Sequence, residues 1–95
     1  MDIQQLRKQI NDIDAQLVKT FDERMRVALQ IAKYKKENGL PVYDPVREEA
    51  VLKKQMAAVD AELAGYAQSL YQTLFEVSRR YQQEYLAQEM PERQA

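Results

Sequence analysis

The chain has 95 residues, of which 45% are hydrophobic and 31% charged, with two glycines, three prolines and a formal net charge of -1. This composition excludes a disordered or collagen-like chain, and the balanced charge excludes an overall field that would attract nucleic acid. The absence of cysteine and histidine excludes disulfides, thiolate nucleophiles, sulfur-ligated zinc and imidazole chemistry, so most hydrolytic mechanisms become hard to write.

The first predicted element is a long amphipathic helix over about residues 3 to 38. Its apolar residues recur at spacings of three and four, which is typical of a helix with one buried stripe. They are Ile3, Leu6, Ile10, Ile13, Leu17, Val27, Ile31 and Tyr34. Gly39 and Pro41 predict the end of this helix. Because a helix of about 50 Å is too long for so small a monomer to cover, we expect an antiparallel, two-fold symmetric dimer.

Two shorter helices are predicted to follow. Asp44 caps free backbone amides and Pro45 suits a first helical position, so a helix is expected over about residues 45 to 58. After a turn at 59–62, a third helix runs to about Tyr85. Its expected buried stripe is Leu63, Tyr66, Leu70, Leu74, Val77 and Tyr81. We therefore predict an all-α domain over residues 1–87, with a frayed tail over 88–95.

The N-terminal residues lack the basic and apolar regions of a signal peptide. No segment approaches the roughly 20 apolar residues that a membrane helix needs. No helix has a one-sided basic face of the kind that binds nucleic acid. We therefore expect a cytoplasmic protein that binds neither membranes nor nucleic acid.

Two cations on the first helix occupy unusual positions. The heptad that begins at Ile3 puts Arg24 at a core position, where an arginine needs an anionic partner. Lys35 lies about three turns further on, so both side chains could close on one small anion. Arg7 lies about 25 Å of helix rise before Arg24, too far for one chain to use both. An antiparallel partner that crosses near Leu17 or Val18 would bring its Arg7 beside this region.

Further polar residues lie on the other two helices. Asp44, Arg47 and Glu48 share one face of the second helix. Ser78 and Gln82 lie one turn apart on the third helix, on a stripe that also carries Phe75. Neutral hydrogen-bonding groups would thus join cations and carboxylates in one site.

In this order and spacing, the chain resembles the all-helical chorismate mutase family. The matching segments are Leu6-Arg7-x-x-Ile10-x-x-Ile13-Asp14, Arg24, Ile31-Ala32-x-x-Lys35, Pro41-Val42-Tyr43-Asp44-Pro45-x-Arg47-Glu48 and Ser78-Arg79-x-x-Gln82. The resemblance implies an isomerase of aromatic amino-acid biosynthesis that converts chorismate to prephenate by a pericyclic Claisen rearrangement. It implies no metal and no cofactor, because the reaction needs only a conformational restraint on a dianion and stabilisation of developing negative charge.

The resemblance also implies an intertwined homodimer with two equivalent sites, each completed by Arg7 of the partner subunit. Arg7, Arg24 and Arg47 would bind the two substrate carboxylates, because guanidinium groups match carboxylate geometry. Ser78 would support carboxylate binding.

The remaining implied roles concern the ether oxygen and the ring hydroxyl of chorismate. Lys35 and Gln82 would donate hydrogen bonds to the ether oxygen, so that they and Arg24 would be the catalytic residues. Glu48, with the backbone near Asp44, would hold the ring hydroxyl. Phe75 is larger than the aliphatic residue that we expect in this wall of the pocket.

Each of these residues also has an ordinary structural explanation. Arg7 alone is better explained as a solvated arginine, Lys35 as part of a charged helix end, and Asp44 as a helix cap. Ser78 and Gln82 would ordinarily face solvent. The site is favoured because all of these residues together occur in the order and spacing of one known site. Two other functions compete: an isochorismate-pyruvate lyase with a similar cationic pocket, and a non-catalytic helical dimerisation module, which would leave Arg24 unexplained.

Overall fold

The computed structural model describes residues 1–89, which form α1 (Ile3–Glu37), α2 (Pro45–Ala57), the short 3-10 helix η1 (Ala61–Leu63) and α3 (Ala64–Glu89). Residues 1–89 contain no strand, which confirms the predicted all-α class. α1 and α2 end within one residue of their expected limits, whereas α3 continues past Tyr85 to Glu89. Residues 90–95 of the expected tail lie outside the described residues.

Local hydrogen bonds define both ends of α1. The Asp2 carboxylate accepts from the Gln5 amide and the Gln5 side chain accepts from the Asp2 amide, each at 2.9 Å, which forms a capping box. At the other end, the Leu40 amide donates to the Lys35 carbonyl at 2.7 Å, and Gly39 has a left-handed φ of 66°. This is the Schellman arrangement in which glycine avoids the steric cost of that conformation, so Gly39 ends the helix as predicted.

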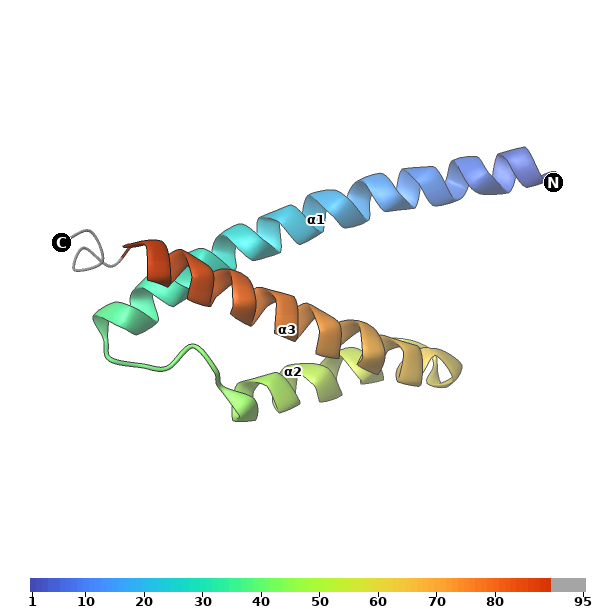
Figure 1. Ribbon diagram of the computed structural model, residues 1–95. Coiled ribbons are helices and arrows are strands. Elements are labelled where there is room, and N and C mark those ends of the chain that lie inside the picture. Colours follow the sequence, from blue (N-terminus) through green and yellow to red (C-terminus); the bar gives the residue numbers. More distant parts are fainter. Residues whose placement is uncertain (90–95) are drawn as a thin grey trace.

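α3 packs against both α1 and α2. Figure 1 shows that it crosses the C-terminal half of α1, while the N-terminal half of α1 extends beyond the other helices. The chain measures 61 × 27 × 15 Å and its radius of gyration is 17.2 Å, compared with about 12 Å for a compact domain of this length. One chain is therefore too elongated to enclose α1.

The buried residues of the described chain all lie on α1 and α3, which pack against each other. They are Ala28 and Ala32 on α1, and Phe75, Ser78 and Gln82 on α3. The two alanines, one turn apart, let the helices approach closely. Two of these five side chains are polar, so the best-covered part of the chain is also the part where we expected a site.

The predicted buried stripe of α3 is wrong for a single chain. Leu63, Tyr66, Leu70 and Tyr81 are exposed, Tyr66 to 76%, and only Leu74 and Val77 of the stripe are half-buried. The buried residues of α3 are Phe75, Ser78 and Gln82 instead. The apolar stripe of α1 is exposed as well, with Ile10 at 56% and Leu17 at 60%. Hydrophobic periodicity identifies an apolar face, but it does not identify the neighbour that covers it.

None of the helices within residues 1–89 has an apolar stretch long enough to cross a membrane.

Candidate functional site

The C-terminal half of α1 supplies two cations that border its contact with α3. Arg24 and Lys35 are half-buried, and Ala28 and Ala32 lie between them along the helix. Arg24 also borders an open hollow of about 440 Å³ whose lining includes Val27 and Ile31. Thr20, Glu23 and Ala28 complete the lining, so the surroundings of Arg24 are partly polar.

Lys35 is held by the segment that connects α1 to α2. Its ammonium donates to the Val42 carbonyl at 2.9 Å, and the contact is partly buried. An ammonium group has three N–H donors, so two remain for other acceptors. This hydrogen bond therefore fixes the position of the cation without using up its capacity to bind a ligand oxygen.

Asp44 begins α2 as a helix cap. Its Oδ1 accepts from the Arg47 amide at 3.0 Å, and Pro45 follows at the first helical position. Arg47 itself is exposed. The capping role expected of Asp44 is confirmed.

Glu48 is paired with a residue of α3 to which the sequence analysis gave no role. Arg79 Nη1 donates to both carboxylate oxygens of Glu48, at 2.6 and 2.5 Å. The guanidinium carbon also lies 4.8 Å from the centre of the Tyr43 ring, a cation–π contact. The hydrogen bond to Glu48 raises the pKa of Arg79 above the ordinary arginine value, and burial opposes this shift.

Ser78 and Gln82 form a buried polar pair on α3. Gln82 Nε2 donates to Ser78 Oγ at 3.1 Å, and the two side chains are only 8% and 6% exposed. Gln82 Oε1 is buried and has no hydrogen-bond partner. A buried polar atom without a partner costs free energy, roughly 1–3 kcal/mol, and its presence in a native fold calls for an explanation. The ordinary alternative, in which Ser78 and Gln82 face solvent, therefore does not apply to this chain.

The wall beside this pair is aromatic. The Tyr71 and Phe75 rings meet edge to face, with centroids 5.8 Å apart and an interplanar angle of 65°. Phe75 is 8% exposed, so a single chain accommodates the bulk of this ring.

Arg7 is the predicted site residue that one chain does not bring to the others. It is exposed and belongs to the N-terminal half of α1, and this half of the helix extends beyond α2 and α3 (Figure 1). Its seventeen-residue separation from Arg24 corresponds to about 25 Å of helix rise. Within a single chain, Arg7 therefore cannot share a small ligand with Arg24.

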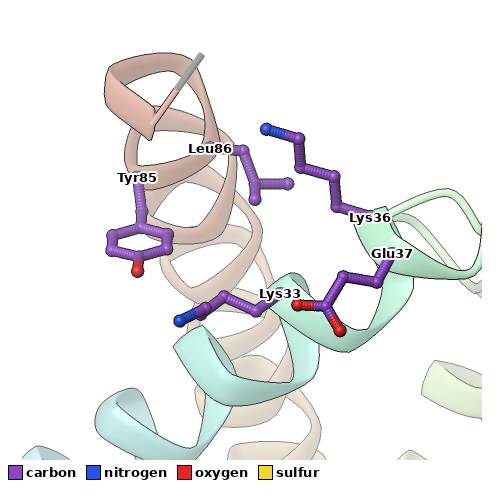
Figure 2. Close-up of a pocket in the computed structure, with 5 residues that line it drawn as sticks. All are labelled: Lys33, Lys36, Glu37, Tyr85 and Leu86. Atoms are coloured by element: carbon purple, nitrogen blue, oxygen red, sulfur yellow. The ribbon is translucent and has the colours of Figure 1, made fainter. Parts of the chain in front are cut away.

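A separate hollow of about 280 Å³ lies between the last turns of α1 and α3. Figure 2 shows Lys33 and Lys36 extending toward Tyr85 and Leu86, with Glu37 beside them. It contains none of the predicted site residues. Within residues 1–89, no three His, Cys, Asp or Glu side chains gather as potential metal ligands.

Sequence reasoning missed three groups that organise the site. They are the Val42 carbonyl that holds Lys35, the Tyr43 ring under Arg79, and Arg79 itself. All three stand inside the quoted motifs. Their contacts join residues of different elements, so the spacing along one helix carried no signal for them.

The chain matches a known family over most of its length. Residues 6–83 match the family model described as chorismate mutase type II. The T-protein of Haemophilus influenzae is 36% identical over 87 residues, which cover 92% of this chain and 22% of that protein.

Two shorter similarities agree with this match. The chorismate mutase of Methanocaldococcus jannaschii is 36% identical over 47 residues, covering 50% of this chain and 48% of that protein. The bifunctional chorismate mutase/prephenate dehydratase of Aquifex aeolicus is 32% identical over 53 residues, covering 56% of this chain and 15% of that protein. The chain thus spans less than half the length of each of these curated relatives.

Proposed function

The chain belongs to the chorismate mutase type II family, whose model it matches from residue 6 to residue 83, and we propose that it isomerises chorismate to prephenate. The reaction breaks a C–O bond and forms a C–C bond in one pericyclic step, and no group leaves. It needs no nucleophile, no proton-transfer base and no electron carrier. In the proposed role, the protein holds a flexible dianion in a compact chair-like conformation and stabilises negative charge on the ether oxygen.

The observation that carries the proposal is the buried Ser78–Gln82 pair with its unpartnered amide oxygen. Rotation of the amide about its last bond lets the Ser78 hydroxyl donate to Oε1. Nε2 then occupies the position that Oε1 held before the rotation, and its two hydrogens can be donated to a ligand. A neutral amide donor in a dry site suits an ether oxygen that gains charge in the transition state, because such donors act most strongly away from water.

The other roles follow from residue chemistry. Lys35 would donate a second hydrogen bond to the ether oxygen through the N–H groups that Val42 leaves free. Arg24 and Arg47 would bind the substrate carboxylates, with Ser78 in support, because guanidinium groups match carboxylates. Glu48 would accept from the ring hydroxyl, beside the backbone at Asp44.

A homodimer would complete each site with Arg7 of the partner subunit. Two observations support it. The apolar stripe on the N-terminal half of α1 is exposed in one chain. The accessible surface of 7744 Å² exceeds the value of about 5,700 Å² expected for a compact monomer of this mass by an amount typical of a large obligate interface.

The test is a product assay with the purified chain. Chorismate loss is followed by ultraviolet absorbance and the product is identified, for the wild type, Arg24→Ala and Gln82→Ala. Prephenate from the wild type, with severe loss in both variants, supports the proposal. Pyruvate from isochorismate with chorismate untouched would favour the lyase. A folded dimer that reacts with neither substrate would favour a dimerisation module.

A further inference from the structure

Arg79 and Glu48 form an ion pair unlike the other three found among residues 1–89. Those three join residues four apart on the exposed face of one helix: Arg26 with Asp22, Lys53 with Glu49, and Arg80 with Glu84. Arg79 and Glu48 are 31 residues apart, on α3 and α2, and their side chains are only 29% and 23% exposed. This pair therefore links two helices in a partly desolvated position.

Arg79 is held from a second side. Its guanidinium lies over the Tyr43 ring, 4.8 Å from the centroid, while one nitrogen donates to both Glu48 oxygens. Tyr43 belongs to the segment before the Asp44 cap, so one side chain connects that segment, α2 and α3. With partners on two other segments of the chain, the guanidinium has little freedom to leave the carboxylate.

The charge of Glu48 presents a difficulty that this pair resolves. A bare carboxylate would repel a substrate that carries two negative charges, and in a partly buried site water screens that repulsion poorly. Arg79 supplies a compensating positive charge. A carboxylate has about four lone-pair positions, so Glu48 still has acceptor capacity for a hydroxyl while it is paired.

We propose that Arg79 is a positioning residue, which holds and neutralises Glu48 so that this carboxylate can accept the ring hydroxyl of a dianionic substrate. This inference rests on the proposed function. It predicts that Arg79 acts on substrate affinity and acts through Glu48, so its effect on KM should depend on the charge of Glu48.

The test is a double-mutant cycle on the full chain with chorismate as substrate. Arg79→Met should raise KM roughly tenfold or more and change kcat much less. The reason is that the substitution weakens the binding of the substrate and of the transition state to the same extent. In a Glu48→Gln background, which has no carboxylate to neutralise, Arg79→Met should have little further effect. Arg79→Lys, which keeps the charge, should recover much of the wild-type KM.

Arg80 provides the matched control. It is adjacent in sequence, its side chain is 67% exposed, and it meets only Glu84 of its own helix, at 3.8 Å. Arg80→Met should leave both kinetic constants unchanged. Raised salt should narrow the KM difference between Arg79→Met and wild type, because it screens the repulsion.

Several outcomes would overturn the inference while leaving the proposed function intact. The first is an active Arg79→Met variant with an unchanged KM. The second is an Arg79→Met substitution that raises KM equally in the wild type and in the Glu48→Gln variant. If Arg79→Met does not fold, Arg79→Lys takes its place. A folded Arg79→Lys whose KM for chorismate is close to that of the wild type supports the inference. A folded Arg79→Lys whose KM is as high as that of Glu48→Ala contradicts it. A wild type that leaves chorismate unchanged would overturn both proposals.

Discussion

Gln82 Nε2 lies 3.1 Å from Ser78 Oγ, one helical turn away, in the part of the molecule that α1 and α3 cover best. Rotation of the Gln82 amide would let the Ser78 hydroxyl donate to Oε1 instead, so Ser78 can pair with this amide in either orientation. Because Oε1 is buried and has no partner among the described residues, the rotation breaks no other hydrogen bond and leaves Nε2 free to donate to a ligand acceptor.

Gln82→Ala should lower kcat by roughly 10²- to 10³-fold, the usual cost of removing one preorganised donor to a developing negative charge. The neighbouring Gln83 is exposed on the same helix, so Gln83→Ala serves as the matched control and should leave kcat unchanged. Steady-state kinetics on variants with native circular dichroism checks both. Equal activity of the two variants would remove Gln82 from the mechanism.

Activity should change little between neutral and mildly alkaline pH, because the Gln82 amide donates without taking up a proton. The Arg79–Glu48 pair should persist across this range too. The hydrogen bond to Glu48 raises the pKa of Arg79. The contribution of this pair to the free energy of unfolding is therefore fully present below the ordinary arginine pKa, and it is lost only as the pH rises through the raised pKa of Arg79.

Gln82→Glu should introduce a pH dependence that the wild type lacks. A carboxylate only accepts hydrogen bonds, whereas a protonated carboxyl donates one. Activity of this variant should therefore fall as pH rises through the titration of the new carboxyl, and a rate profile measured from acid to alkaline pH checks this. A profile parallel to that of the wild type would contradict the donor role.

Arg7→Ala and Arg24→Ala should each be inactive, yet a mixture of the two should recover activity. In a mixed dimer, one site has the intact Arg24 of one subunit and the intact Arg7 of the other, while the second site lacks both. Random exchange of subunits should restore about a quarter of the wild-type activity. A mixture that stays inactive after exchange, shown by a tagged subunit, would argue against shared sites.

Leu17→Glu should break the proposed dimer, because it puts a charge on the apolar stripe of α1, where Leu17 is 60% exposed in one chain. Gln16→Glu, an adjacent change outside that stripe, should leave assembly intact. Sedimentation gives the oligomeric state, and the melting temperature of the wild type should rise with protein concentration. A wild type that sediments as a monomer at all concentrations would exclude the dimer.

Asp44→Asn should preserve the start of α2, whereas Asp44→Ala should cost about 1 kcal/mol of the free energy of unfolding. Both substitutions remove the charge, but asparagine can still accept from the Arg47 amide, as Asp44 does at 3.0 Å. Urea unfolding separates the two variants. Full activity in Asp44→Asn would show that the backbone and the cap matter rather than the carboxylate.

Much of the fold was predictable because its signals are local. Gly39 at a left-handed φ and the Asp44–Pro45 cap act over one or two turns, so the sequence alone located the end of α1 and the start of α2. The extent of α3 was harder, because no Pro or Gly marks the residues after Tyr85 within the helix.

The neighbours of each helix face were not predictable in the same way. Leu70 and Phe75 lie on different apolar stripes of α3, and only the packed structure shows that Phe75 is covered by the same chain. The Arg79–Glu48 pair joins residues 31 positions apart, and helical spacing carries no information on such a contact.

The central claim is most directly tested by identifying the product that the purified wild-type chain forms from chorismate, by nuclear magnetic resonance, with a metal chelator present. The account predicts prephenate as the sole product, formed much faster than in buffer and at the same rate with or without the chelator. A folded chain in whose presence chorismate reacts no faster than in buffer would contradict the proposed function.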